Sequence, residues 1–152
     1  MERHKKKIAA DYASDIPALY PINRFNLGNV YFQQKKFGKA ETLLLESVQM
    51  AQKILNQPIL AEGNILLGQI HTQRGEFDLA RTHLQKGLSI ATAINPKTAA
   101  NAHAALRDWA AAKKDYPQAL AYAKKFQELR DSVYNTEKVK IAENLEIGRA
   151  HV

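Results

Sequence analysis

One set of residues occurs three times along this chain at nearly constant spacing, and it restricts the possible folds more than any other feature. An aromatic residue recurs at steps of 40 and 39 residues, and a leucine before it and an alanine after it keep the same steps. The three sets are Leu27, Phe37 and Ala40; Leu67, Phe77 and Ala80; and Leu106, Tyr116 and Ala119. A period of this size is typical of repeat proteins, in which each unit is stabilised by stacking on its neighbours.

Each unit contains signals for two helices. Prolines stand 20, 19 and 20 residues before the three aromatic residues, and each follows a polar residue suited to capping a helix. These pairs are Asp15 and Pro17, Asn56 and Pro58, and Asn95 and Pro96. Turns are expected at 35–36, 74–76 and 113–114, and a second helix begins near each aromatic residue. With apolar steps of three and four and no alternation of period two, the sequence predicts an all-α solenoid of helical hairpins.

The 152 residues, with a mass of 17.1 kDa, are expected to form a single domain. The predicted segments are an N-terminal helix, either the end of an earlier unit or a cap, over 1–14; repeats over 17–56, 57–95 and 96–132; and a C-terminal capping or linker helix over 133–152. In that last helix, Val139, Ile141 and Leu145 are available to cap the solenoid or to pair with another chain.

The residues around the turns resemble the tetratricopeptide repeat (TPR). Leu27 and Gly28, an aromatic residue at Tyr31, and then Phe37 with Ala40 match the pattern of that family, and the resemblance covers residues 17 to about 132. The units are five or six residues longer than the usual length of about 34. Longer units of this kind resemble those of bacterial signalling proteins, where TPR arrays lie beside a kinase, cyclase or DNA-binding domain. The resemblance implies a right-handed solenoid that binds other proteins.

The chain departs from the family pattern at two places. The position of a Trp-like residue holds Arg24, Asn64 and His103, and the third unit has Arg107 and Ala110 where a glycine and an aromatic residue belong. Because terminal repeats are atypical, the third unit is expected to end the array.

Two glycines stand inside predicted helices, where glycine costs about 1 kcal/mol relative to alanine. Gly28 and Gly68 occupy the same position in the first two units. We expect the two helices of each hairpin to cross closely at these glycines, with Ala40 or Ala80 opposite.

The concave face, formed by the first helix of each hairpin, is the expected binding surface. Asn29 and Gln33 lie four residues apart on one helix face, and Gln69 and Gln73 repeat them. Amides donate and accept hydrogen bonds, so this ladder suits an extended peptide backbone, although such residues also simply solvate an exposed helix. The candidate partner-binding residues are Phe25, Asn26, Asn29, Gln33, Glu62, Gln69, Thr72, Gln73, Asn101 and Asp108.

One TPR subfamily binds the C-terminal carboxylate of chaperones through a clamp of lysine, asparagine and arginine. Of that pattern only Asn29 is present, and Asp108 has the wrong sign at another position. A co-chaperone of this kind is therefore not expected.

Chemistry beyond binding finds little support in the sequence. The chain has no cysteine, which excludes disulfides, thiolate metal sites and cysteine nucleophiles. His71 and His103 are expected on neighbouring helices near Asp108, but no H-E-x-x-H motif accompanies them, so core histidines are expected rather than metal ligands. His4, His83 and His151 are expected at the surface. Without a catalytic motif, we predict no enzyme, no metal and no cofactor.

The formal net charge of +7 raises nucleic acid as a partner from another class. Lysines cluster at the turns and elsewhere, in 35–39, 113–114 and 124–125, but no aromatic residues alternate with them, so a solvated basic rim is the favoured interpretation. No apolar run is long enough to span a membrane, and a complete chain would be cytoplasmic.

The leading functional hypothesis is a non-catalytic module that binds a peptide or helix on its concave face, as a sensory or scaffold segment of a bacterial signalling protein. The segment Asp131–Lys138 resembles the stretch that leads into a linker helix in such proteins, and a free-standing adaptor is the other possibility. Self-association through the ends of the solenoid is a further possibility, and a basic nucleic-acid-binding solenoid remains the alternative.

Overall fold

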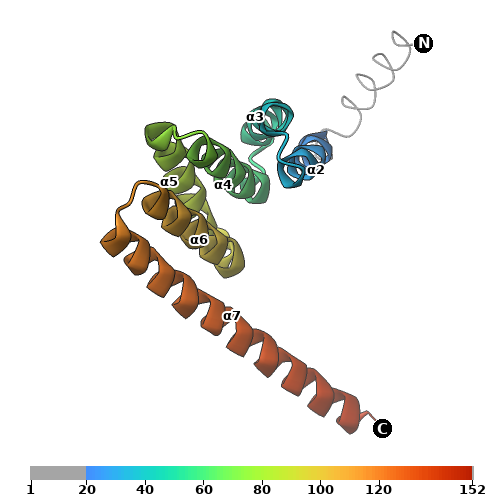
Figure 1. Cartoon of the computed structure of the whole chain (residues 1–152). Coiled ribbons are helices and arrows are strands. Elements are labelled where there is room, and N and C mark those ends of the chain that lie inside the picture. The colour runs from blue at the N-terminus through green and yellow to red at the C-terminus, as the bar shows by residue number, and fades with distance from the viewer. Residues whose placement is uncertain (1–19, 152) are drawn as a thin grey trace, which may run out of the picture.

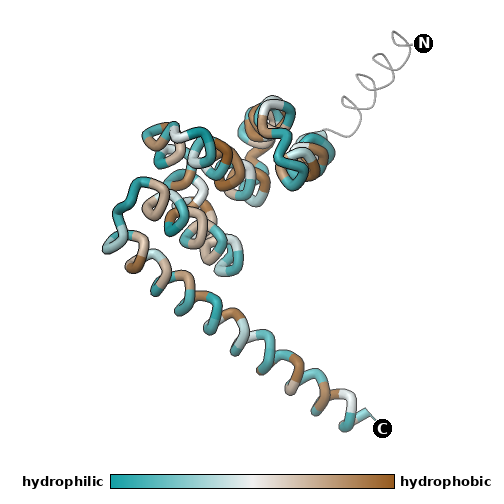
Figure 2. The backbone as a smooth tube through the Cα atoms, viewed as in Figure 1, coloured by the Kyte–Doolittle hydropathy of each residue, from teal (hydrophilic) through white to brown (hydrophobic). Residues whose placement is uncertain are grey.

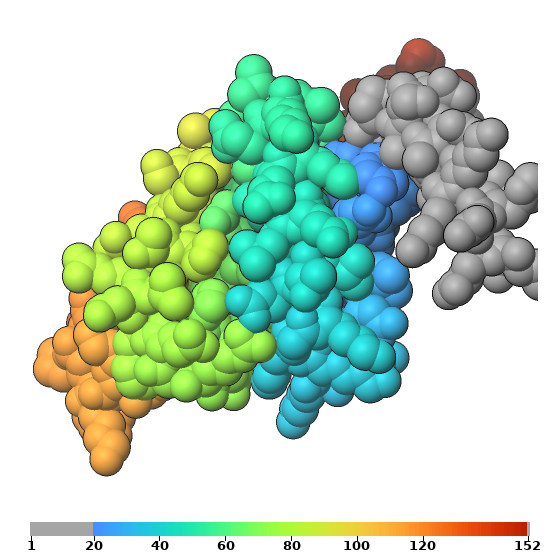
Figure 3. Space-filling model, turned by 90° about the horizontal axis from the view of Figure 1, so that it is seen from above, coloured from blue at the N-terminus to red at the C-terminus, as the bar shows by residue number. Residues whose placement is uncertain are grey.

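The computed structural model describes residues 20–151, and within that range the chain forms six α-helices and no strand. Consecutive helices pair as three stacked hairpins (Figure 1). The pairs are α2 (Tyr20–Gln33) with α3 (Phe37–Ile54), α4 (Gln57–Gln73) with α5 (Phe77–Ile94), and α6 (Pro96–Ala112) with α7 (Tyr116–Ala150). In Figure 3 the first unit, blue to cyan, lies beside the second, green to yellow-green. The predicted all-α hairpin solenoid is confirmed, whereas the helix expected over 1–14 and the cap at Pro17 lie outside the described residues.

The starts of α4 and α6 follow from their capping residues. Pro58 lies in the first turn of α4, and the Asn56 side chain accepts a hydrogen bond from the Ile59 N–H at 3.2 Å. Pro96 opens α6, and the Asn95 side chain accepts from the backbone N–H of Lys97 at 2.9 Å. A proline in the first turn loses no helical hydrogen bond, and the asparagine satisfies an otherwise free N–H.

The same turn joins the two helices of every unit. Its second residue has a left-handed backbone: Lys35 (φ 59°), Gly75 (φ 76°) and Lys114 (φ 64°). The N–H of the next residue donates to a carbonyl five residues back, at 2.9 Å in all three units. This hydrogen bond is typical of a left-handed C-cap, which favours glycine because a side chain there is strained. Only the second unit has glycine at this position, so the turn forms in the other two units without it.

Close helix crossing at the two glycines is confirmed, and opposite each glycine lies a leucine one turn beyond the predicted alanine. A Cβ atom on Gly68 would lie 2.5 Å from Cγ of Leu84 and 3.2 Å from the backbone oxygen of Ala80. A Cβ on Gly28 would lie 3.0 Å from Cγ of Leu44. Gly68 therefore meets Leu84 and the backbone of Ala80, and Gly28 meets Leu44. Both leucines are fully buried.

The hydrophobic core continues from one unit to the next. One cluster combines residues of α2, α3 and α4, among them Leu44 and Leu67, and another combines α4 to α7, among them Leu84 and Leu106. Trp109 of the third unit is 3% exposed and donates its indole N–H to the Phe77 carbonyl of the second unit at 2.9 Å. Stacking thus completes the core of each hairpin, as expected for a solenoid.

The helix α7 continues without a break for 35 residues, so the predicted boundary between 132 and 133 falls inside a helix. Its second half projects away from the hairpins (Figure 1) and carries apolar residues at intervals (Figure 2). Several large apolar residues of this half are more than half exposed, among them Tyr134, Val139, Ile141 and Leu145. In the described chain these residues do not cap the solenoid. A search of the described helices for one long and apolar enough to cross a bilayer finds none.

A candidate peptide-binding groove

The three first helices line one hollow of about 520 Å³ on the face that they share. Six of the residues predicted for partner binding line it together: Phe25, Asn29, Gln33, Glu62, Gln69 and Asn101. Their amide groups and the partly apolar floor lie in one continuous surface across α2, α4 and α6. That these residues bind a partner remains a prediction.

Four of the predicted residues do not line this hollow. Asn26 and Gln73 are exposed elsewhere on α2 and α4. Thr72 is buried, and its hydroxyl donates to the Gly68 carbonyl at 2.9 Å. Asp108 is exposed and pairs at 3.0 Å with Arg107, its neighbour in sequence.

Sequence reasoning missed the remaining residues of the hollow, which are Phe32, Ile65, Leu66, Asn95, Lys97, Thr98 and Ala104. Ile65 and Ala104 follow the predicted Phe25 at steps of 40 and 39, so the repeat spacing itself contained this signal. Lys97 and Thr98 lie at the start of α6. They line the hollow because the third unit stacks on the second, and no sequence pattern predicts the geometry of this stacking.

In the first and third units, the residue at the Trp-like position is polar and contacts the second helix of the same hairpin. Arg24 pairs with Glu46 at 2.9 Å and lies 4.0 Å above the Tyr20 ring. His103 lies 6.2 Å from the Tyr122 ring, and its pKa is lowered by burial and by nearby Lys125. These positions therefore use polar contacts where the family pattern uses a large aromatic residue.

In the second unit the residue at the Trp-like position is completely buried. The amide nitrogen of Asn64 donates to the Leu60 carbonyl at 2.7 Å, and its oxygen lies 2.9 Å from Nδ1 of His83. Since an amide oxygen only accepts, this geometry requires the proton of His83 on Nδ1. His83 is half-buried and not at the surface, which corrects the sequence prediction.

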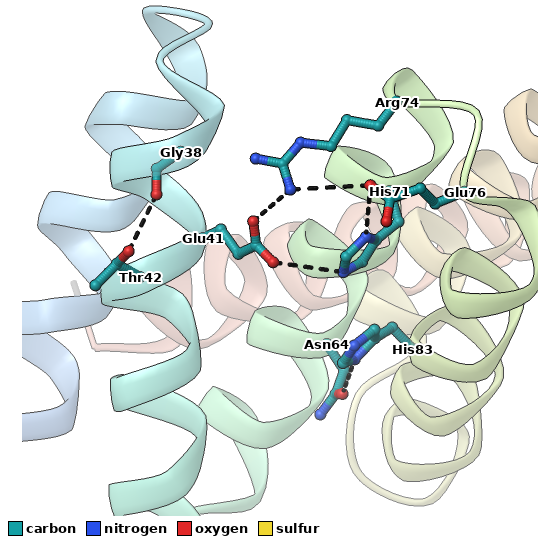
Figure 4. Close-up of polar contacts among 8 residues, drawn as sticks. All are labelled: Gly38, Glu41, Thr42, Asn64, His71, Arg74, Glu76 and His83. Atoms are coloured by element: carbon teal, nitrogen blue, oxygen red, sulfur yellow. Dashed lines mark hydrogen bonds and ion pairs between the residues drawn. The ribbon is translucent and has the colours of Figure 1, made fainter.

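His71 occupies the hairpin core as expected, but its partner is His83 and not His103. The two rings are stacked, with centroids 5.4 Å apart and planes 7° from parallel. His71 Nδ1 lies 3.5 Å from a Glu76 oxygen, and its Nε2 lies 3.9 Å from Glu41 of the first unit (Figure 4). Arg74 pairs with the same Glu41, so charged groups link α3 to the second hairpin. The described residues contain no cluster of three or more metal-ligating side chains.

The pKa of His83 is lowered, chiefly by burial and secondarily by His71 and Lys86, while Glu41 acts in the opposite direction. Burial disfavours the charged form of an imidazole, and a second imidazole stacked on it adds repulsion when both are protonated. His83 therefore favours its neutral form in the folded protein.

Several lysines of the basic rim lie over aromatic rings of the same unit. Lys36 and Lys39 lie 5.9 and 5.5 Å from the centroid of Tyr31, and Lys113 lies 4.4 Å from that of Trp109. The Trp109 ring is buried and hydrogen-bonded, so it offers no free face for a nucleic-acid base.

Comparison with known families gives one result. Residues 21–93, which include the first two hairpins, match the sequence model of the tetratricopeptide repeat. Residues 21–93 are therefore tetratricopeptide repeats, which are non-catalytic modules that generally mediate protein–protein interactions. The match ends before the third hairpin, the unit with Arg107 and Ala110 at pattern positions. A search of curated proteins finds no match.

Proposed function

We propose that this chain is a non-catalytic interaction module that binds an extended peptide or a helix in the groove of α2, α4 and α6. The observation that supports this most is the joint lining of one hollow of about 520 Å³ by amide and apolar side chains from three consecutive units. The amides of Asn29, Gln69 and Asn101 suit hydrogen bonds to a peptide backbone, and Phe25 and Leu66 offer apolar surface to side chains.

The experiment compares two glutamines of α4 that differ in position. Gln69 lines the groove, whereas Gln73 lies one turn further on, outside it. Peptides selected from a displayed random library on the intact chain are measured against Gln69→Ala and Gln73→Ala. We expect a loss of about fivefold to tenfold in affinity for Gln69→Ala, as for one hydrogen bond, and no change for Gln73→Ala. Failure to select any peptide, or equal affinities of the two variants, contradicts the groove as the binding site.

We further propose that ligand binding in the groove changes the position of the projecting half of α7, as in a sensory or scaffold segment of a signalling protein. The continuity of α7 supports this, because its first half packs on α6 and its second half projects from the same rigid element. The chain has no cysteine, so spin labels on cysteines introduced at Gln49 and Lys140, both exposed, report one distance. A selected peptide should change that distance distribution, and an unchanged distribution contradicts the transmission role.

A basic nucleic-acid-binding solenoid is the alternative function. The lysines at the turns favour it, but three of them lie over aromatic rings of the protein, which favours a solvated rim. Binding of a duplex or single strand that weakens steeply between low and moderate salt would support the alternative.

A further inference from the structure

Glu62 is the acidic residue of the groove, and the described residues do not neutralise it. It lies on α4 and lines the groove, is half-buried, and forms no ion pair or side-chain hydrogen bond with any described residue. Burial raises the pKa of its carboxyl group. A carboxylate that loses water without gaining a partner is destabilised, so this arrangement has a cost in the unbound protein.

The absence of a partner for Glu62 does not result from a shortage of cationic residues in the chain. The chain has 22 lysines and arginines against 15 acidic residues, and Glu41, Glu46 and Asp108 all pair with arginines. Lys97 lines the same hollow, yet it does not pair with Glu62. The groove therefore retains a carboxylate free to meet a charge from outside.

From this placement we infer that the ligand presents a cationic group to Glu62, namely a lysine or arginine side chain or a terminal amine. The inference rests on the proposed peptide-binding function and gives it a chemical class. Asn29, Gln69 and Asn101 hold the backbone of the ligand, an apolar side chain lies on Phe25 and Leu66, and the cation pairs with Glu62. Because the pair forms in a partly desolvated hollow, it is stronger than a surface ion pair.

The test uses the library-selected peptides and the intact chain, with Glu62→Gln as the isosteric neutral variant. Glu143→Gln is the matched control, since Glu143 is exposed on the projecting half of α7 and its replacement changes the net charge equally. Peptides selected on the wild type should share a lysine or arginine at one position. Glu62→Gln should bind them about tenfold more weakly, and Glu143→Gln should bind them with unchanged affinity. Replacing the basic residue of the peptide by norleucine should cause the same loss of affinity for the wild type and no loss for Glu62→Gln.

The outcomes separate the two proposals. Selected peptides that depend on Gln69 but lack a shared basic residue, or that bind Glu62→Gln as well as the wild type, overturn this inference and leave the groove intact. Peptides with a shared acidic residue also overturn it. Absence of any selected peptide contradicts the groove itself. Circular dichroism of both variants ensures that the comparison is between folded proteins.

Discussion

The first and second repeats place the same residue types at the same positions in different surroundings. Leu67 is completely buried, whereas Leu27, its counterpart 40 residues earlier, is 47% exposed. Leu67 belongs to a core cluster that includes Leu44 of the preceding hairpin, and no described helix precedes the hairpin of Leu27. The comparison teaches that the place of a unit in the stack decides how much of its pattern contributes to stability.

A second contrast concerns the residues that lie between the two helices of each unit. The first unit has Arg24 and Tyr31 where the second has Asn64 and His71. Arg24 and Tyr31 are part-exposed and contact charged groups near the surface, whereas Asn64 and His71 are buried. In the second unit, therefore, a hydrogen-bonded amide and stacked imidazoles take over positions that are partly solvated in the first.

The largest expected difference comes from truncating the two leucines. Leu67→Ala should lower the free energy of unfolding by about 2–5 kcal/mol, since it opens a cavity between two hairpins. Leu27→Ala should change it by less than about 0.5 kcal/mol, as expected for an exposed position. Urea unfolding followed by circular dichroism measures both. Equal losses would show that Leu27 is covered in solution and would remove the contrast between the units.

The glycines should give the next largest difference. Gly68→Ala places its new atom 2.5 Å from Leu84, and the resulting overpacking should cost about 1–3 kcal/mol. Gly28→Ala places it 3.0 Å from Leu44, and the gain in helix propensity, about 1 kcal/mol, should offset much of the strain. Thermal melts of both variants test this.

Gly38→Ala is the control for the glycines, because a Cβ at Gly38 meets no atom within 4 Å. It should be neutral or stabilising. A melting temperature of Gly68→Ala equal to that of Gly38→Ala would contradict close crossing at Gly68.

The sequence predicted the hairpins well because their signals are local. Asn56 with Pro58, and Asn95 with Pro96, begin helices through contacts within a few residues. The contact of Gly68 with Leu84, in addition to Ala80, was not predictable in the same way, because the crossing angle between the helices decides which side chains meet there. Sequence spacing defines the face of a helix but not the point where two faces meet.

For the candidate site, the limits of prediction have two different origins. The predicted surface position of His83 is wrong, although Leu43 and Tyr122 occupy the same position in the other units and the repeat spacing therefore indicates a packed residue. Lys97 and Thr98 enter the groove through the stacking of α6 on α4, which no single hairpin encodes. The first error was avoidable from the spacing, whereas the second required the structure.

The smallest expected effect is a pH dependence of stability that belongs to the second unit. The pKa of His83 is lower in the folded chain than its ordinary value of 6.5, so the neutral form is favoured by folding. The contribution of neutral His83 to the free energy of unfolding is therefore complete above pH 6.5, and it is lost as the pH falls toward the lower pKa of the folded state. His71 and Lys86 strengthen this trend, and Glu41 opposes it.

Unfolding free energies at pH 7.5 and pH 5.5 test the trend, because most carboxyl groups keep their charge in this window. The wild type should lose stability between the two pH values, and His83→Gln should lose less, since an amide does not titrate. His103, whose pKa is also lowered, leaves a residual slope in both proteins. Identical slopes of unfolding free energy against pH for the wild type and His83→Gln would mean that the stacked imidazoles of the second unit tolerate protonation. The polar core of the second unit would then respond to acid in the same way as the first unit.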